Sequence, residues 1–362
     1  MIIFTSICAN YLHKARTLAE SVKQNIPDAK FIVSLLEREV KDSYRFDAFD
    51  DIVLAKDSWG DGFERFIFKH TIVEASTSVK GRFFQYLYEM YPEENKFVYL
   101  DPDIYVYSDF TELRHVLDSR PIVLCPHLLQ PGNIDMELSS TAHGVYNLGF
   151  LAVNRSEEAR KFIDWWANRL SLFCYDDMGR GIFTDQKWVD LAPCFFDVEI
   201  FKHRGYDFAP WSLLDCGMYE DNGKMYVKGD PLRFIHFSGY GASTEKCMRE
   251  WLPDGDHAFK KLYKEYSVIH ERNNSDNISK EPWSYAFYYS GEKIEDKVRY
   301  KYRSSYDLMY LCSDPFENSN SFYKNKKTTP NYKIYVNKAL DVYNREGLGA
   351  LTQKIINKLF RQ

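Results

Sequence analysis

Short apolar runs alternate with helical spacing along the first third of the chain. Ile2 to Ile7 is a run rich in β-branched residues, and apolar residues then recur at helical spacing from Leu12 to Val22. A second, longer helical pattern extends from 63 to 91. Further short apolar runs lie at 31–33, 52–54, 97–100 and 122–124. Alternating strands and helices predict parallel strands joined by crossovers, so we expect an α/β fold with ligands at the carboxyl ends of the strands.

The second half of the chain divides near residue 240. The apolar run at 148–153 and the segment at 233–237 predict strands, and helical spacing extends from 157 to 170. Beyond residue 240 the sequence becomes rich in Lys, Glu, Tyr and Asn, with helical spacing in patches. We therefore expect a sheet-containing domain over 1–240 and a mainly helical region over 241–362.

The C-terminal region ends in a predicted amphipathic helix. Residues 313–331 precede it as a polar, proline-containing stretch typical of a loop. The helix carries an apolar stripe opposite basic residues: Leu348, Leu351, Ile355 and Leu359 against Lys354, Lys358 and Arg361. Such a stripe packs on a protein core or, alternatively, rests on a membrane surface with its basic residues near anionic lipid.

Composition excludes several classes of protein. Of the 362 residues 45% are hydrophobic and 17% aromatic, which is typical of a folded chain with a sizeable core. The net charge of −5 disfavours a nucleic-acid partner, since phosphate neutralisation requires a basic excess. No apolar run approaches the roughly 20 residues of a membrane span.

The termini and the cysteines indicate a reducing compartment. The first dozen residues are expected to form a buried strand rather than a signal peptide. The seven cysteines are odd in number and none are spaced as CxxC. This pattern favours reduced thiols in the cytoplasm over a disulfide framework or a structural zinc site.

The segment from Val98 to Val106 indicates chemistry most strongly. An apolar strand runs directly into Asp101 and Asp103, which flank Pro102, and apolar character then resumes. Side chains two positions apart on an extended chain point the same way, and carboxylates near a core are costly without compensation. Two carboxylates on one side suit Mg²⁺ or Mn²⁺, which would hold a diphosphate. A solvated turn or a helix N-cap is the alternative.

Three further segments place polar residues beside predicted elements. His236 ends a strand and Gly239 follows, where the backbone could approach a phosphate closely; a structural, hydrogen-bonded histidine is the alternative. Asp185 is the next candidate site residue. In the alternative, Thr184 caps a short helix and Asp185 lies in its first turn. Asn147 stands before a strand, where turn formation is the alternative. The sequence contains no Walker A, HExxH or GxSxG motif and no complete dinucleotide fingerprint.

Taken in order, these segments resemble the GT-A glycosyltransferases that use a nucleotide sugar, in particular the glycogenin-like and lipopolysaccharide-galactosyltransferase-like retaining enzymes. In that family a DxD strand end is followed by an N-x-G strand, a D-Q helix and a late HxxG. The matching residues are Asp101 to Asp103, Asn147 to Gly149, Asp185 with Gln186, and His236 to Gly239. The segments around Pro126-His127 and Trp165-Trp166 also resemble bacterial sugar transferases found with surface-polysaccharide genes. The resemblance covers 1–240 and implies a GT-A, Rossmann-like mixed sheet flanked by helices, with a helical C-terminal extension.

The resemblance also implies roles for the matched residues. Asp101, Asp103 and His236 would bind Mn²⁺ or Mg²⁺. A nucleotide-sugar donor, expected to be a UDP-sugar, would contact the end of the first strand, a basic residue and the late glycine: Thr5, Ser6, Asn10, Tyr11, Lys80 or Arg82, Asp101 and Gly239. The pocket for the transferred sugar would contain Asn147, Asp185 and Gln186.

The implied activity is transfer of a hexose to a glycan or lipid-linked glycan acceptor in bacterial surface polysaccharide synthesis, with retention of configuration. One departure is the missing Lys-Pro-Trp after HxxG, where the sequence reads Gly-Ala-Ser-Thr-Glu-Lys up to Lys246. The lysine that would bind the diphosphate is therefore unassigned. Two alternatives are a non-catalytic carbohydrate-binding protein with a decayed transferase fold, and a nucleotidyltransferase. Nucleotidyltransferases usually carry a phosphate-binding loop rich in Gly, Arg and Lys near the N-terminus. The segment from Phe4 to Tyr11 contains none of these residues, which speaks against this alternative.

Overall fold

We analysed a computed structural model of the protein. It describes residues 1–253, 255, 257–326, 349 and 352. The chain forms two compact units. The first comprises 1–63 and 72–285, and the second 64–71 with the chain from 286 onward. The first unit thus extends past residue 240, and the predicted functional boundary there stays a prediction.

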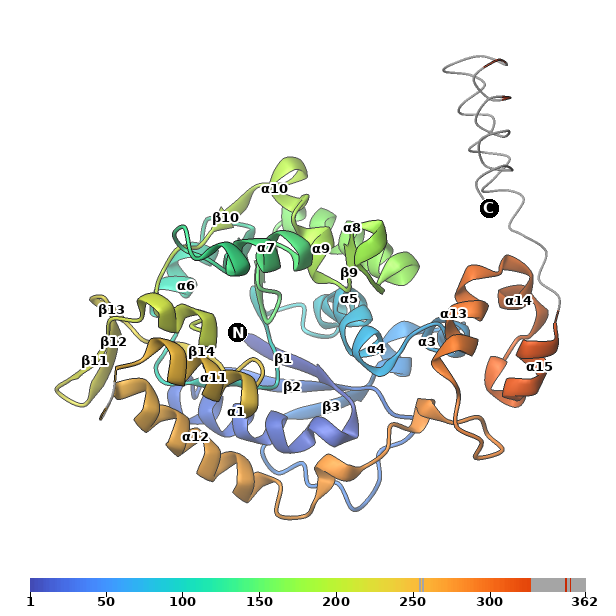
Figure 1. Cartoon of the computed structure of the whole chain (residues 1–362), viewed down its shortest axis with the longest axis horizontal. Helices are drawn as coiled ribbons and strands as arrows, with labels where there is room; N and C mark the ends of the chain where they lie inside the picture. The colour runs from blue at the N-terminus through green and yellow to red at the C-terminus, as the bar shows by residue number, and fades with distance from the viewer. Residues whose placement is uncertain (254, 256, 327–348, 350–351, 353–362) are drawn as a thin grey trace. The chain divides into compact units, whose positions relative to one another are not determined.

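A seven-stranded mixed sheet forms the centre of the first unit (Figure 1). Its order is β10-β6-β7-β4-β1-β2-β3. The bounds are β1 (Ile2–Ile7), β2 (Lys30–Leu35), β3 (Asp51–Leu54), β4 (Lys96–Leu100), β6 (Ile122–Leu124), β7 (Phe150–Asn154) and β10 (Val198–Ile200). Strand β7 runs antiparallel to both of its neighbours, β4 and β6, and every other neighbouring pair in this sheet is parallel. The α/β class and the mixed sheet are confirmed.

Helices cover both faces of this sheet because its central strands are apolar on both sides. Along β1, Ile3 joins one core cluster and Phe4 the other. The first cluster is completed by α1 (Leu12–Asn25) and α6 (Thr111–Leu117), and the second by α5 (Lys80–Met90) and α8 (Glu157–Phe173). Gly81 lets α5 approach α8 closely, since a Cβ atom there would lie 2.7 Å from Ala167 Cα.

Smaller sheets and short helices surround this core. The two-stranded sheet of β5 (Ile104–Val106) and β14 (Phe234–His236) carries part of the candidate site. The other small sheets contain β8 (Asp176–Asp177), β9 (Ile182–Phe183), β11 (Met218–Asp221), β12 (Lys224–Val227) and β13 (Asp230–Pro231). The remaining helices of this unit are η1 (Ala9–Tyr11), α2 (Ala55–Trp59), α4 (Ile72–Ser78), α7 (Ile134–His143), η2 (Met178–Arg180), α9 (Gln186–Val189), α10 (Ala192–Phe195), η3 (Pro210–Asp215), α11 (Ala242–Trp251), α12 (Ala258–Asn273) and η4 (Ile278–Lys280).

The long helix predicted over 63–91 is wrong as a single element. The structure has α3 (Phe63–Ile67), α4 and α5 there. The first break coincides with 64–71, which belong to the second unit. The second break lies at Val79, between α4 and α5. Neither a glycine nor a proline marks either break, so the helical spacing continued across both.

The second unit packs around aromatic side chains. The Phe68 ring contacts Tyr302, Phe316 and Tyr323, and the Phe68 carbonyl accepts a 3.1 Å hydrogen bond from Arg299 Nη1. Its helices are α13 (Asp296–Ser304), α14 (Tyr306–Leu311), η6 (Pro315–Glu317) and α15 (Asn320–Asn325), and η5 (Ser284–Ala286) lies where the two units meet in sequence.

The loop predicted over 313–331 is wrong for most of the part that the structure describes, because η6 and α15 occupy 315–317 and 320–325; residues 327–331 lie outside the described residues. Asp314 and Ser319 cap η6 and α15 through their side chains, so the polar residues there are helix caps rather than a linker. The helical character predicted beyond 240 is confirmed as far as the described residues extend. Apart from Gly349 and Thr352, the predicted final helix lies outside those residues. Over the described part of the chain, no helix is long and apolar enough to span a bilayer.

Candidate metal and nucleotide-sugar site

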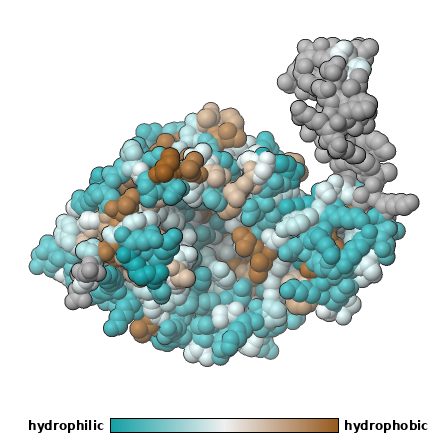
Figure 2. Space-filling model, viewed as in Figure 1, coloured by the Kyte–Doolittle hydropathy of each residue, from teal (hydrophilic) through white to brown (hydrophobic). Residues whose placement is uncertain are grey.

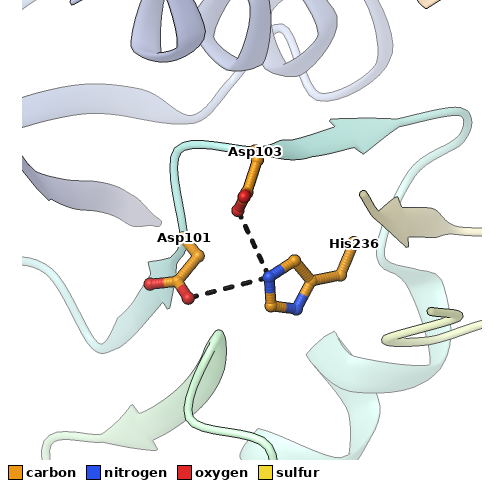
Figure 3. A group of neighbouring side chains, drawn as sticks. All are labelled: Asp101, Asp103 and His236. Carbon is orange, nitrogen blue, oxygen red and sulfur yellow. Dashed lines mark ion pairs between the residues drawn. The ribbon is translucent and has the colours of Figure 1, made fainter. Parts of the chain in front are cut away.

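Asp101, Asp103 and His236 converge at one end of the central sheet (Figure 3). His236 Nε2 lies 3.2 Å from Asp103 Oδ1 and 3.7 Å from Asp101 Oδ2. One ligand atom from each residue falls within 4.8 Å of the others. Two carboxylate oxygens and an imidazole nitrogen form a donor set that suits a divalent cation.

Strand pairing explains why a histidine 133 positions after Asp103 and 135 after Asp101 reaches the two aspartates. Asp101 directly follows β4 and Asp103 directly precedes β5. Antiparallel pairing of β14 with β5 places His236 opposite Ile104, and the Phe237 amide donates to the Asp103 carbonyl at 2.9 Å. The imidazole therefore lies beside the aspartates as a consequence of β-sheet register.

The Asn147-Leu148-Gly149 segment supports the histidine ring. Asn147 Nδ2 lies 3.1 Å from His236 Nδ1, and Asn147 Oδ1 accepts a 3.0 Å hydrogen bond from the Gly149 amide. A Cβ atom at Gly149 would come within 2.3 Å of His236 Cε1. Glycine is therefore required here because the imidazole occupies the space of a side chain.

Charges around the cluster favour the ionised carboxylates. Burial alone would lower the pKa of His236, but Asp103 and Asp207 raise that pKa to about 10. Burial alone would raise the pKa of Asp103, but His236 and Lys14 outweigh it and hold that pKa below its ordinary value. Lys14 Nζ is 3.6 Å from Asp103 Oδ2 and 4.2 Å from the centre of the Tyr11 ring. Asp103 is thus held as an anion, as cation binding requires.

A buried lysine lies behind Asp101. Lys80 Nζ is 2.9 Å from Asp185 Oδ2 and 3.5 Å from Asp101 Oδ1, and its side chain is 2% exposed. Burial opposes its charge, but the two carboxylates outweigh burial and raise the pKa of Lys80. Tyr99 donates a 2.5 Å hydrogen bond to Asp101 Oδ1. This network fixes the orientation of Asp101 from the protein interior.

A first cleft opens beside Asp101 and Asp103 at the end of β1. Ser6, Asn10 and Tyr11 line it, and α4 supplies a wall. Glu37 positions the η1 turn by accepting a 2.8 Å hydrogen bond from the Ala9 amide. The polar atoms Ser6 Oγ and Asn10 Oδ1 have no hydrogen-bond partner among the described residues, and Tyr11 is 41% exposed. The cleft therefore offers polar groups and an aromatic face to a ligand.

A second cleft adjoins Asp101 and His236 on the other side. Asn147, Gln186, His127 and Trp211 are among its lining residues. Gln186 is held at both ends, since its Oε1 accepts from the Leu148 amide and its Nε2 donates to the His143 carbonyl, each at 3.1 Å.

His127 is a neutral lining residue of this second cleft. Its Nδ1 lies 2.9 Å from the Gly144 carbonyl, which can only accept, so Nδ1 carries the proton and Nε2 is left as an acceptor. Burial lowers the pKa of His127 to about 4, which keeps the ring neutral near pH 7.

The helix α7 borders the second cleft without being part of the core. None of its residues is buried, although Met136, Ser139 and Ser140 line the cleft. Ile134 and Leu138 of this helix are 66% and 59% exposed. The face of the molecule in Figure 2 is largely hydrophilic, with a few small apolar patches. The wall of this cleft is thus built partly from a loosely packed helix.

Some predicted residues lie away from the clefts. Thr5 is fully buried within β1, and Asp185 is buried as the partner of Lys80. Of the two basic residues predicted to contact the donor, Lys80 lies beside Asp101. Arg82 is exposed, and its guanidinium contacts Gln85 and the Trp59 ring instead. Gly239, with φ of 67°, lies in the turn between β14 and α11.

Three residues of the site were not predicted from the sequence. Lys14 lies inside a helical pattern and Tyr99 inside a strand. His127 belongs to the Pro126-His127 segment of the resemblance, which predicted no role for it. Asp207 stands in irregular chain at a positive φ of 52°. Of these residues, only Tyr99 lies in an apolar run that could have drawn attention to it.

Comparisons with known proteins place the chain near glycosyltransferase structures. No family model matches it. YfnD and YfnF of Bacillus subtilis strain 168, both uncharacterized, are 25% and 26% identical over 49% and 45% of this chain. The chain spans little more than half of these relatives, 57% and 55% of their lengths.

Solved structures similar to this chain include the galactosyltransferase LgtC in complex with donor and acceptor sugar analogs. The TM-score is 0.45 at 16% identity, over 75% of this chain and 96% of LgtC. The glycosyltransferase GlyE of Streptococcus pneumoniae TIGR4 follows, with a TM-score of 0.43 at 13% identity, over 78% of this chain and 65% of GlyE. Both of these solved structures are glycosyltransferases, at a likeness too low to carry an activity across.

Proposed function

We propose that the protein is a divalent-metal-dependent glycosyltransferase that moves a sugar from a nucleotide diphosphate donor, with a UDP-sugar favoured, to a glycan acceptor. The observation that supports this function most is the position of Asp101, which lines both clefts. Asp103 lines only the first and His236 only the second. A cation at this cluster would lie where a nucleotide on one side meets a sugar on the other.

The residues present fit Mn²⁺ or Mg²⁺. Carboxylate oxygens suit both ions, and the imidazole of His236 adds a nitrogen ligand. When bound, such an ion would stabilise the negative charge that develops on a departing diphosphate. Lys14 lies beside Asp103 at the same edge, so we propose it as the lysine that contacts the diphosphate.

The first cleft is the proposed nucleoside site. The exposed ring of Tyr11 offers a face on which a base can stack, and Ser6 and Asn10 are polar residues of the cleft lining. Thr5 would support this edge from within β1 rather than touch the nucleotide.

The second cleft is the proposed sugar and acceptor site. Asn147 and Gln186 would hydrogen-bond sugar hydroxyls, and Trp211 would pack against an apolar sugar face. His127 Nε2 would accept a hydrogen bond from an acceptor hydroxyl. We propose retention of configuration, supported by the resemblance of the DQ and HxxG segments to retaining enzymes. Proton NMR of the product would show a linkage of inverted configuration if retention is wrong.

The biological setting is proposed from the sequence motifs, the predicted final helix and the cysteines. The bacterial surface-polysaccharide role and a lipid-linked acceptor rest on the resemblance of the sequence motifs, and peripheral membrane contact rests on the predicted final helix. A cytoplasmic location is supported by the seven cysteines, all of which are free.

The function is tested by screening UDP-, GDP- and CDP-sugars for metal-dependent turnover with simple sugar acceptors. Wild-type protein should transfer sugar from one donor class with Mn²⁺ and lose turnover with a chelator. Asp103→Ala should abolish this turnover. Asp197→Ala, which removes an exposed carboxylate paired with Arg120, should leave it unchanged. Donor binding without transfer would favour the non-catalytic alternative, and release of pyrophosphate from a nucleoside triphosphate would favour a nucleotidyltransferase.

A further inference from the structure

A buried carboxylate lies behind the turn that carries Asn10 and Tyr11. Glu37 follows the end of β2 and is 2% exposed. Its Oε1 accepts a 2.8 Å hydrogen bond from the Ala9 amide, and its Oε2 accepts one of the same length from the Ser284 amide. The carboxylate therefore joins this turn to a segment near the end of the first unit in sequence.

The Ala9 amide needs an acceptor that its own turn does not supply. Ala9 is the first residue of η1, and the first amides of a helix have no partner within that helix. Cys8, which precedes η1, makes no side-chain hydrogen bond to these amides. Ala9 is fully buried, where an unpaired amide is costly. Glu37 thus caps η1 from another part of the chain.

Further hydrogen bonds hold Trp283 and Ser284 against the chain that follows β2. Trp283 Nε1 donates to the Leu36 carbonyl at 2.9 Å, and the Arg38 amide donates to Ser284 Oγ at the same distance. Both neighbours of Glu37 in sequence are therefore tied to the segment that contains its second donor. These bonds leave the carboxylate little freedom to move away from the Ser284 amide.

A carboxylate suits this position because two donors converge on it. Each of its oxygens accepts, so both amides are paired at once. Glutamine has nearly the same size, but one of its two terminal groups is an NH₂ that only donates. In place of Glu37, glutamine would leave either the Ala9 or the Ser284 amide without an acceptor.

We propose that Glu37 is a positioning residue of the nucleoside site. It holds η1 so that Asn10 and Tyr11 face the nucleoside, and it makes Ser284 part of the support of the first cleft. This inference rests on the proposed function, in which the first cleft takes the nucleoside. Asn10 and Tyr11 line that cleft, whereas Glu37 lies behind the lining and acts through the Ala9 amide.

The test compares a nucleoside diphosphate with pyrophosphate, both titrated calorimetrically in the presence of Mn²⁺. UDP, GDP and CDP are titrated first, and the one that binds wild-type protein most tightly is used. Glu37→Gln should weaken its binding by about tenfold, because η1 loses part of its support. Pyrophosphate has no nucleoside, so its affinity should stay at the wild-type value. Glu39→Gln, which neutralises an exposed carboxylate two positions along the chain, is the matched control and should leave both affinities unchanged.

The ratio of the two affinities separates positioning from a general loss of structure. A variant that is partly unfolded would bind both ligands less and keep their ratio, whereas a displaced η1 lowers the affinity for the nucleoside diphosphate alone. A folded Glu37→Gln protein whose ratio equals the wild-type value would overturn the role of Glu37.

A second measurement uses wild-type protein and does not depend on any variant. The Ser284 amide is bonded to Glu37, so its exchange with deuterium, followed by NMR, should slow when the nucleoside diphosphate holds η1 in place. Pyrophosphate should slow it less, and equal exchange with the two ligands would overturn the role of Glu37. If wild-type protein binds neither ligand, the proposed function fails together with this inference. If it binds both equally tightly, the diphosphate site stands and the nucleoside site fails.

Discussion

Replacing Gly149 by alanine should remove the histidine from the metal site while leaving all three ligand residues in the sequence. The new Cβ atom would lie 2.3 Å from His236 Cε1 and 2.5 Å from Nδ1. Ordinary contact needs 3.4 Å or more, so the ring must retreat by about 1 Å. Metal sites tolerate deviations of roughly 0.2 Å in ligand distance, so a shift of this size removes His236 as a ligand.

The expected result is a loss of Mn²⁺ affinity of on the order of a hundredfold, with overpacking costing about 1–3 kcal/mol of folding stability. Calorimetric titration gives the first quantity and urea denaturation the second. Gly179→Ala is the control, because a Cβ atom there meets no atom closer than 3.9 Å. Wild-type Mn²⁺ affinity in a folded Gly149→Ala protein would refute the assignment of His236 as a ligand.

Three further predictions test other parts of the structure. Gly81→Ala should cost about 1–3 kcal/mol in urea denaturation, because its Cβ would lie 2.7 Å from Ala167 Cα, while Mn²⁺ affinity stays at the wild-type value; a parallel loss of metal binding would contradict this. Burial chiefly lowers the pKa of His13 to about 3, so below pH 6.5 the histidine is protonated in the unfolded chain before it is protonated in the folded protein. The free energy of unfolding should therefore drop by about 1.4 kcal/mol for each pH unit below 6.5. His13→Gln should flatten this dependence, and an unchanged slope would exclude His13 as its source. The amides of α7, which has no buried residue, should exchange with deuterium faster than those of α8 and slow when a nucleotide sugar binds; equal exchange of the two helices would show that α7 is firmly packed.

Much of the fold follows from local pattern. The buried run Ile2–Ile7 and the helical spacing after it became β1 and α1, because hydrophobic periodicity reports burial directly. The antiparallel direction of β7 could not be seen in the same way, since an apolar run has no direction. The breaks within 63–91 were also invisible, because no glycine or proline lies between the helices; the first break lies within 64–71, which belong to the second unit.

The candidate site was predictable where short motifs carry its residues. Asp101 and Asp103 stand out at a strand end, and resemblance to a family supplied His236 as their partner. The structure adds a reason for that pairing in the register of β14 against β5. The supporting residues could not be foreseen, since Asp207 and Lys14 act through distances set only by the folded chain.

The central claim is that Asp101, Asp103 and His236 hold a cation that binds a nucleotide diphosphate. The most direct measurement is calorimetric titration of the protein with UDP in the presence and absence of Mn²⁺. The account predicts that Mn²⁺ tightens UDP binding by about tenfold or more, corresponding to about 1.4 kcal/mol, and that Asp103→Ala removes this gain. Equal UDP affinity with and without Mn²⁺, or no UDP binding at all, would contradict it.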